Sequence, residues 1–447
     1  MKINVRDRAF KALKDIFINK SYSNLAAIKY SRDLDGREKA FLRELMYGTL
    51  ENSIYYEWII SKFSKIKMKK IDEDVKIIMK TAIHQILCLD RIPDSAAVNE
   101  AVKLVGKYSN RGAKGFANGV LRSISRKKDS LPEISRKDTA EYLSVRYSYQ
   151  KWMIKMWIDD YGAEFTEELC RANNERHYMN IRVNGLKAEA EDIERFLSEN
   201  GYEFEKSEYS DMSYKIENPS GLVDSEIYRD GKIDIQDITS VMAAEALSPK
   251  PGENILDICA APGGKTGCLA DLMDNRGSIS ARDIYENKIS QIEDKMKRLG
   301  VSCVKAETGD AEVFREENTE KWDRCLADVP CSALGLIRNK PEIKYFRTEE
   351  SMELFPETQM NILKNASEYV EKGGTLVYST CSINRRENEE LVKRFLEENP
   401  EFELSDFSSD IKKSIISDDA EKGMIQFFPN VHGTNGFFIA KMKKNEN

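Results

Sequence analysis

The stretch Asp257-Ile258-Cys259-Ala260-Ala261-Pro262-Gly263-Gly264-Lys265-Thr266 decides the fold of this chain. Residues 253–256 before it are typical of a short buried strand, and residues 267–273 after it are typical of a helix. A strand that passes through a turn of small residues into a helix is how parallel α/β sheets build nucleotide sites. Asp257 then lies at the carboxyl end of the strand, where such sheets bind their ligands.

Three interpretations of this turn compete. Gly264-Lys265-Thr266 matches the end of a phosphate-binding P-loop, but that motif needs a glycine where Cys259 stands, which excludes it. An ordinary strand-to-helix turn is the second interpretation, because such turns favour Gly and Pro. The third is a methyl-donor site, which requires a carboxylate at the end of the next strand to bind ribose hydroxyls. Asp283 supplies that carboxylate, and Asp257 in the turn also favours S-adenosylmethionine.

Length and composition narrow the class of protein. A chain of 447 residues is long enough for about two to four domains. No stretch has the length and apolarity of a membrane span, and the start of the chain has no signal-peptide core, so we expect a cytoplasmic protein without a membrane partner. The eight cysteines form no C-x-x-C pair and only three histidines are present, which favours reduced thiols and no metal site.

Charge is distributed unevenly along the chain. Residues 1–128 carry 27 Lys and Arg against 14 Asp and Glu, a net charge of +13. Because the whole chain carries −7, the remainder carries −20. This asymmetry predicts a basic attachment module for RNA joined to an acidic body, although a solvated helical surface is the alternative. One basic run is of the kind that contacts phosphates, and it consists of Lys62, Lys65, Lys67, Lys69 and Lys70.

Hydrophobic periodicity predicts three domains. Residues 1–130 form an all-α domain, with one helix around Arg8–Phe17 and others at 38–50, 54–63, 74–89 and 96–107. Residues 131–233 form a small α+β domain, which mixes helices at 152–161, 164–173 and 191–199 with strands at 179–184, 202–205 and 214–217. Residues 234–447 form a Rossmann-like α/β domain.

The last domain alternates strand and helix in chain order. We predict five parallel strands at 253–256, 277–283, 304–310, 322–327 and 373–379, with helices at 288–299 and 357–370 among them. An antiparallel pair at 424–428 and 436–442 then completes a seven-stranded sheet. In the usual strand order of this class, the fourth and fifth strands are neighbours beside the first.

Two cysteines occupy equivalent positions in this sheet. Cys331 and Cys381 each follow directly after the carboxyl end of a strand. Both should therefore open onto the crevice that holds the turn of residues 257–266, called the donor turn below, with their sulfurs facing each other. The alternative for any cysteine is burial as a small apolar side chain. We prefer that alternative for five others, namely Cys88, Cys170, Cys268, Cys303 and Cys325.

Paired thiols at a methyl-donor site indicate the kind of acceptor. Oxygen and nitrogen acceptors need only positioning and a base, whereas C5 of a pyrimidine is a poor nucleophile. A thiolate that adds at C6 converts the ring to an enamine, which attacks the methyl group from C5. A base then removes the C5 proton and the thiolate leaves. The two cysteines therefore select pyrimidine carbon as the acceptor.

Several motifs together resemble one family. Asp328-Val329-Pro330-Cys331-Ser332 and Ser379-Thr380-Cys381-Ser382 resemble the RNA 5-methylcytosine methyltransferases. Residues 98–122 resemble the NusB-type RNA-binding helical domain, and Ile181 to Asn184 with Gln236-Asp237 resemble elements that precede the catalytic domain of the RsmB family, also called Sun or Fmu. Together with residues 259–266, the resemblance covers nearly the whole chain. One departure is Asn435, where the family usually has Asp, in a loop that we interpret as structural.

The resemblance implies roles for individual residues. Cys381 is the expected nucleophile, Cys331 assists release of the product, and Asp328 binds the cytosine edge with Lys265 nearby. The expected contacts to S-adenosylmethionine come from Cys259, Ala260, Ala261, Pro262, Gly263, Gly264, Lys265, Asp283, Asp310 and Asp328. No metal is expected.

We therefore expect an enzyme that methylates C5 of a cytosine in 16S ribosomal RNA and acts as a monomer. One alternative is the same chemistry on a tRNA or on 23S ribosomal RNA. Another is a NusB-like RNA-binding or antitermination factor with an inactive methyltransferase domain. A flipped or single-stranded cytosine would be the substrate.

Overall fold

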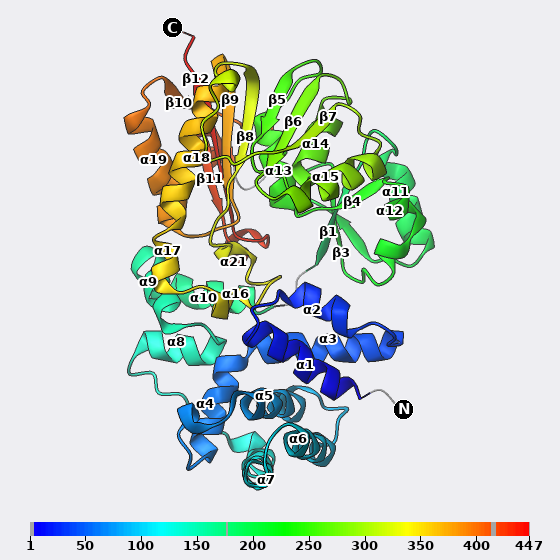
Figure 1. The fold of residues 1–447 in the computed structure, drawn as a ribbon, viewed down its shortest axis with the longest axis vertical. Coiled ribbons are helices and arrows are strands. Elements are labelled where there is room, and N and C mark those ends of the chain that lie inside the picture. The colour runs from blue at the N-terminus through cyan, green and yellow to red at the C-terminus, as the bar shows by residue number, and fades with distance from the viewer. Residues whose placement is uncertain (1–3, 176–177, 413–416, 447) are drawn as a thin grey trace. The chain divides into compact units, whose positions relative to one another are not determined.

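The computed structural model describes residues 4–175, 178–412 and 417–446. Packing divides the chain into two compact units (Figure 1). The first contains residues up to 175 together with Ile337–Glu349, and the second contains residues 176–336 and 350–447.

The first unit is all-α, as the sequence predicts. Its elements are α1 (Val5–Phe17), α2 (Ser23–Tyr30), α3 (Gly36–Glu51), α4 (Ser53–Phe63), η1 (Met68–Lys70), α5 (Glu73–Cys88), α6 (Asp94–Tyr108), α7 (Arg111–Arg126), η2 (Lys128–Ser130), α8 (Thr139–Tyr147), α9 (Lys151–Tyr161), α10 (Ala163–Asn173) and α16 (Ile343–Phe346). Asp35 and Glu38 form a reciprocal capping box that fixes the start of α3. The individually predicted helices are confirmed, and α2, α7, α8 and α16 are additional.

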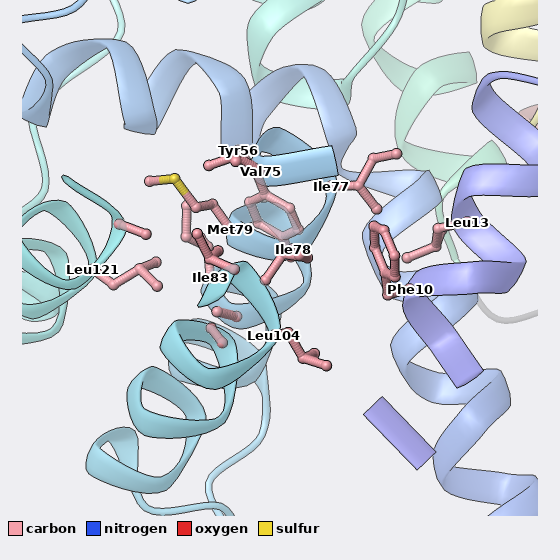
Figure 2. Close-up of a cluster of buried hydrophobic side chains, with 14 of the residues drawn as sticks. Phe10, Leu13, Tyr56, Val75, Ile77, Ile78, Met79, Ile83, Leu104 and Leu121 are labelled. Carbon is pink, nitrogen blue, oxygen red and sulfur yellow. The ribbon is translucent and has the colours of Figure 1, made fainter. Parts of the chain in front are cut away.

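Helix α5 is the centre of this unit. Figure 2 shows its side chains Val75, Ile78, Met79 and Ile83 among buried residues of the neighbouring helices, including Phe10. Nearly every residue from Val75 to Ile86 is buried, so α5 is enclosed on all sides. Burial of such a helix supplies most of the stability of a helical domain, because short helices are marginal alone in water.

A segment from the second half of the sequence belongs to the helical unit. Lys344 on α16 is 1% exposed, and its Nζ donates to the carbonyl oxygens of Glu51 and Tyr147, both at 3.2 Å, and to Asn174 Oδ1 at 2.7 Å. Burial lowers the pKa of Lys344 to about 8. These bonds fasten residues 337–349 to the ends of α3, α8 and α10.

The second unit contains two sheets. The smaller one has the strand order β2-β3-β1-β4, and its pairs are antiparallel. Its elements are β1 (Met179–Val183), α11 (Ala190–Glu199), β2 (Phe204–Lys206), β3 (Ser213–Ile216), η3 (Leu222–Asp224), α12 (Glu226–Arg229) and β4 (Ile233–Ile235). The predicted α+β character is confirmed here, and β4 is a strand that the prediction lacks.

The larger sheet carries the predicted methyltransferase strands. Its order is β10-β12-β9-β8-β5-β6-β7, and β11 also pairs with β12. The strands are β5 (Asn254–Asp257), β6 (Ser278–Asp283), β7 (Val304–Thr308), β8 (Trp322–Asp328), β9 (Val370–Thr380), β10 (Phe402–Leu404), β11 (Met424–Phe427) and β12 (Phe437–Lys444). The prediction of seven strands is wrong by one, because the three-residue β10 adds an eighth beside β12.

Helices cover both faces of the larger sheet (Figure 1). Helices α13 (Ile238–Leu247), α14 (Gly264–Leu272) and α15 (Glu286–Leu299) pack on one face, where Ile255, Leu326 and Val377 are buried. Helices α18 (Phe355–Tyr369) and α19 (Glu389–Glu398) pack on the other, against Leu256 and Leu376. The remaining short elements are η4 (Glu316–Asn318), η5 (Leu334–Leu336), α17 (Glu349–Met352), η6 (Arg385–Glu387), α20 (Ser417–Glu421) and α21 (Pro429–His432).

The strand order confirms the prediction on which the site depends. β8 lies between β5 and β9, and all three are parallel. The fourth and fifth parallel strands are therefore neighbours beside the first, and their carboxyl ends meet at one edge.

The two sheets are joined by buried polar contacts. Arg182 on β1 pairs with Asp271 on α14, and both side chains are almost fully buried. Asn184 Nδ2 donates to the carbonyl oxygen of Leu299 at 2.9 Å, and Lys295 on α15 pairs with Asp234 on β4 at 2.8 Å.

Packing groups α8, α9 and α10 with the N-terminal helices, whereas the predicted domain of residues 131–233 includes them with the small sheet. The predicted boundaries at residues 130 and 233 stay a prediction. Among the described helices, none combines the length and apolarity that crossing a membrane requires.

Candidate active site

The donor turn joins β5 to α14 as the sequence predicts. β5 ends at Asp257, and α14 begins at Gly264. Gly263 has a φ of +91°, in the left-handed region that favours glycine. A Cβ there would also lie 3.3 Å from the Met296 methyl carbon, so the turn has little room for a side chain.

Asp257 is a buried carboxyl with two different oxygens. Oδ2 accepts a hydrogen bond from Thr266 Oγ1 at 2.7 Å. Oδ1 is buried and has no hydrogen-bond partner among the residues that the structure describes. Burial raises the pKa of Asp257 to about 7. A buried acceptor without a partner in a turn of this kind is the feature expected where a ligand supplies the missing donor.

A cavity of about 180 Å³ lies over this turn. It brings together many of the predicted donor-binding residues, namely Cys259, Ala260, Ala261, Pro262, Gly264, Lys265 and Asp328, and also Asp257. Further residues that the sequence analysis did not place in the site complete the wall, namely Ile235, Gln236, Asp237, Ser240 and Lys295. The resemblance around Gln236-Asp237 was the signal that could have placed those two here.

Asp283 and Asp310 lie outside the wall of this cavity. Asp283 ends β6 and accepts from the backbone N–H of Tyr285 at 3.1 Å. Asp310 follows β7, accepts from the N–H of Glu312 at 2.9 Å, and lines a separate small hollow with Ile258 and Tyr369. Asp283 and Asp310 therefore lie at the carboxyl ends of β6 and β7, the two strands that follow β5 in the sheet order.

Lys265 and Asp328 form an ion pair between the donor turn and the end of β8. Lys265 Nζ lies 2.7 Å from Asp328 Oδ2, and Ser379 Oγ donates to Asp328 Oδ1 at 2.8 Å. Burial alone would lower the pKa of Lys265, but the charge and hydrogen bond of Asp328 outweigh it and raise that pKa. Lys265 is therefore held charged at neutral pH.

The two cysteines face each other, as the strand order predicts. Cys331 Sγ and Cys381 Sγ are 3.0 Å apart, within hydrogen-bonding distance for sulfur. The hydrogen bond with Cys381, followed by burial, raises the pKa of Cys331 well above its ordinary value. Cys331 is therefore a neutral thiol at neutral pH, able to donate its proton toward the Cys381 sulfur.

The other cysteines divide into two groups. Cys170, Cys268 and Cys325 are buried, as the small-apolar interpretation predicts. Cys303 is intermediate, and Cys88 is exposed. The prediction of burial is wrong for Cys88 because it is the last residue of α5, beyond the enclosed part of that helix.

The unusual Asn435 has a clear contact. Its Nδ2 donates to Asp237 Oδ2 at 2.6 Å. An aspartate at position 435 would place a second acceptor-only group against that carboxylate. The contact links the loop before β12 to the start of α13, in keeping with the structural interpretation of that loop.

The residues present fit S-adenosylmethionine. The unpartnered Asp257 Oδ1 is an acceptor for a donor's N–H or O–H group, and the small-residue turn gives the ligand access to backbone. The carboxylate of Asp283 ends β6, and Asp310 follows β7, at the strand ends where sheets of this kind bind ligands. Within the described ranges, no cluster of three or more His, Cys, Asp or Glu side chains could hold a metal ion.

Family profiles match three parts of the chain. Residues 3–126 match the NusB family, residues 149–222 match the ferredoxin-like domain of RsmF/B-like methyltransferases, and residues 244–443 match the 16S rRNA methyltransferase RsmB/F. The sheet order, the donor turn and these profiles together define the chain as a Rossmann-like methyltransferase with a NusB domain.

Relatives extend over the full length. The chain is 36% identical to the probable ribosomal RNA small subunit methyltransferase B of Bacillus subtilis, over 99% of both chains. It is 32% identical to ribosomal RNA small subunit methyltransferase B of Klebsiella pneumoniae subsp. pneumoniae, over 100% of this chain and 99% of that one. The chain belongs to the RsmB/F family of 16S rRNA methyltransferases.

A solved structure has the same architecture. The crystal structure of PH0851 covers 99% of this chain and 100% of its own, at 28% identity and a TM-score of 0.82. A methyltransferase homolog protein from Pyrococcus horikoshii covers 70% of this chain and 100% of its own, at 30% identity and a TM-score of 0.60.

Proposed function

We propose that this protein methylates C5 of a cytosine in 16S ribosomal RNA, with S-adenosylmethionine as donor, through a covalent bond between Cys381 and C6. The 3.0 Å approach of the Cys331 and Cys381 sulfurs, beside the donor turn, carries this proposal. Methyl transfer to oxygen or nitrogen gives no use for two thiols at this place, whereas a pyrimidine carbon must be activated by a nucleophile.

Cys381 is the nucleophile of the pair. Its sulfur lies 3.0 Å from the Cys331 sulfur, and the raised pKa of Cys331 keeps that thiol neutral, which leaves Cys381 as the member of the pair that attacks. Addition of that thiolate to C6 moves electron density to C5, which becomes the nucleophile for the methyl group.

Cys331 acts after the transfer. As a neutral thiol beside the C6–sulfur bond, it donates its hydrogen bond to the sulfur that must leave, once a base has removed the C5 proton. Cys331 therefore assists release of the methylated base and is not needed for the first attack.

Asp328 and Lys265 orient the cytosine. Asp328 is 28% exposed at its side chain, pairs with Lys265 of the donor turn and ends β8 shortly before Cys331, so it is placed to accept from the exocyclic amino group of cytosine. Its bonds from Lys265 and Ser379 fix the carboxylate at that place.

The donor supplies an electrophilic methyl group when it is bound at the turn. Residues 259–262 and Gly264 contribute backbone and small side chains to its site, and Asp257 contributes the buried acceptor. Asp283 and Asp310 bind its hydroxyl groups and base from the ends of the neighbouring strands.

The RNA target is supported by the relatives and by charge. Relatives that match over the full length bear the name ribosomal RNA small subunit methyltransferase B. The net charge of +13 in residues 1–128 fits attachment to phosphates. Action as a monomer in the cytoplasm, without a metal or a membrane partner, belongs to the same proposal.

The test is methyl transfer from labelled donor to purified, unmodified 16S ribosomal RNA, with 23S ribosomal RNA and tRNA as parallel substrates. We expect label in 16S RNA, at one cytosine that bisulfite sequencing identifies. Label confined to 23S RNA or tRNA would contradict the target and retain the chemistry. Binding of RNA without label in any of the three would point to an RNA-binding or antitermination factor instead.

A further inference from the structure

Each of the two cysteines is followed by a serine, and the two serines meet. Ser332 Oγ and Ser382 Oγ are 2.8 Å apart, and both residues are completely buried. Both hydroxyls also donate to one oxygen of Glu387, at 2.5 Å from Ser332 and 2.8 Å from Ser382. A single carboxylate therefore joins the loop of Cys331 to the loop of Cys381.

Glu387 accepts bonds from further groups. Its Oε2 accepts from the backbone N–H of Ser332 at 2.8 Å and from Gln359 Nε2 at 2.9 Å, and its Oε1 accepts from Asn384 Nδ2 at 3.1 Å. Gln359 Nε2, on α18, also donates to the carbonyl oxygen of Pro330 at 3.0 Å. Three of the five donors carry N–H groups, which cannot reverse direction, so the site requires a group that only accepts.

The burial of Glu387 adds to this conclusion. The residue is 0% exposed, and no cation pairs with it in the salt bridges of the described residues. A buried carboxylate is costly unless hydrogen bonds compensate it, and here five donors converge on two oxygens. The same contacts exclude a role for Glu387 at the protein surface, although the segment around it is charged.

We propose that Glu387 is the positioning residue of the thiol pair: it holds the Cys331 and Cys381 loops in the register in which the two sulfurs meet. This inference rests on the proposed covalent function. Removal of the carboxylate frees both serines at once, so both sulfurs lose their fixed separation, whereas removal of either cysteine leaves the other loop in place.

The charge of Glu387 has a second effect. It is one of the causes that raise the pKa of Cys331, after the hydrogen bond with Cys381 and burial. A neutral side chain at position 387 therefore lowers the pKa of Cys331, and the thiol loses its proton at a lower pH. A residue that merely fills space would leave that titration unchanged.

The experiment compares full-length Glu387→Gln with Glu390→Gln, an exposed control three residues along the chain. Single-turnover methyl transfer is measured across pH on saturating RNA and donor. We expect Glu387→Gln to slow transfer about 100-fold, the effect of misplacing a reacting group by about 1 Å, with RNA and donor affinities within about twofold of wild type. In multiple turnover, which includes the release step that Cys331 assists, we also expect the alkaline limb of the pH profile to move to lower pH.

A second variant guards against a folding defect. Ser382→Ala keeps Glu387 and its bonds from Ser332, Gln359 and Asn384. It removes the bond from Ser382 to Glu387, together with the acceptor for the Asn384 backbone N–H and the contact with Ser332 Oγ. We expect it to fold and to slow formation of the covalent RNA adduct.

Cys381→Ala is measured alongside, because it tests the covalent function itself. If Cys381→Ala is inactive while Glu387→Gln matches Glu390→Gln in rate and pH profile, the positioning role of Glu387 is overturned and the covalent function stands. If Cys381→Ala is active, the proposed function fails first.

Discussion

Two aspartates at the donor turn differ in their surroundings. Asp328 accepts hydrogen bonds from Lys265 and Ser379. Asp257 has one hydroxyl partner and no ion-pair partner among the described residues, and burial raises its pKa to about 7. At neutral pH the Asp257 carboxyl is therefore about half protonated.

The effect of Asp257→Asn on stability should depend on pH, because burial raises the pKa of the native carboxyl. The native carboxyl keeps its proton up to about pH 7, whereas the carboxyl of the unfolded chain loses its proton near pH 3.8. The contribution of this group to stability is therefore complete below pH 3.8 and is lost as pH rises to 7. Asparagine has no proton to lose and can still accept from Thr266. In urea unfolding, the gain in unfolding free energy of the variant over wild type should be larger at pH 8 than at pH 5. Each tenfold difference in proton affinity between the folded and the unfolded carboxyl contributes about 1.4 kcal/mol. Equal gains at both pH values would contradict the buried, raised pKa.

Asp283→Ala should weaken donor binding by about 1–3 kcal/mol, the scale of removing hydrogen bonds to a charged group. RNA affinity should barely change, because the residue lies at the donor end of the sheet. Titration calorimetry with S-adenosylmethionine measures the effect, and Asp294→Ala, exposed on α15, is the matched control. Unaltered donor affinity would remove Asp283 from the site.

At the residue scale, the sequence predicted the pair of Cys331 and Cys381 but not Glu387, the residue proposed to hold their loops. Cys331 and Cys381 were predictable because each follows a strand end and the strand order of the class is regular. Glu387 was not, because Arg385-Arg386-Glu387-Asn388-Glu389-Glu390 has the composition of an exposed helix start. Only the three-dimensional meeting of Ser332 and Ser382 identifies its function.

At the scale of elements, the turn before β12 and the Cys331 loop are in direct backbone contact. Gly436 N–H donates to the carbonyl oxygen of Gly335 at 2.9 Å, and Gly335 N–H donates to that of Cys381 at 3.0 Å. The antiparallel end of the sheet therefore supports the active-site loops.

Gly335→Ala tests that support. A Cβ at position 335 would lie 1.8 Å from the carbonyl oxygen of Gly436, so backbone must move. We expect a loss of about 1–3 kcal/mol in unfolding free energy and slower methylation. Gly115→Ala on α7 has nothing within 4 Å of its Cβ and should be neutral or stabilising by about 0.5–1 kcal/mol. Urea unfolding of both variants measures these free energies. Equal unfolding free energies for Gly335→Ala and Gly115→Ala would contradict the tight contact at Gly335.

The elements that sequence missed have physical reasons. Helix α13 is buried on nearly every side, so it lacks the polar face that makes a helical period visible. Strands β4 and β10 have three residues each, too few for an alternation to stand out. Strands β5, β6, β8 and β9 were predictable because turn residues bound runs of buried apolar residues.

At the scale of the whole molecule, basic charge and chemistry are separated along the chain. The basic run lies around η1 in the first unit, and its lysines are exposed. The thiols and the donor turn all belong to the second unit. The inclusion of residues 337–349 in the first unit could not be predicted, because Glu342, Lys344 and Tyr345 resemble an ordinary exposed stretch until their buried partners are known.

Replacement of Lys65, Lys67, Lys69 and Lys70 by Gln should weaken RNA binding and flatten its dependence on salt. For each phosphate that the variant no longer binds, the slope of log K against log salt should fall by about 0.7–0.9. Turnover on saturating RNA should be retained, because the thiols lie in the other unit. Filter binding across salt concentrations measures the slope, with Lys305→Gln/Lys422→Gln as an exposed control, 81% and 73% accessible. An unchanged slope would assign this run another purpose.

The most direct test of the covalent mechanism is a denaturing gel of Cys331→Ala and Cys381→Ala, each incubated with target RNA and donor. If Cys381 attacks C6 and Cys331 assists release, Cys331→Ala should methylate once and stay linked to RNA, as a slow band that survives denaturant and requires the donor. Cys381→Ala should give neither methylation nor a linked band. A linked band from Cys381→Ala alone would exchange the two roles, and full activity of Cys381→Ala would contradict the covalent mechanism.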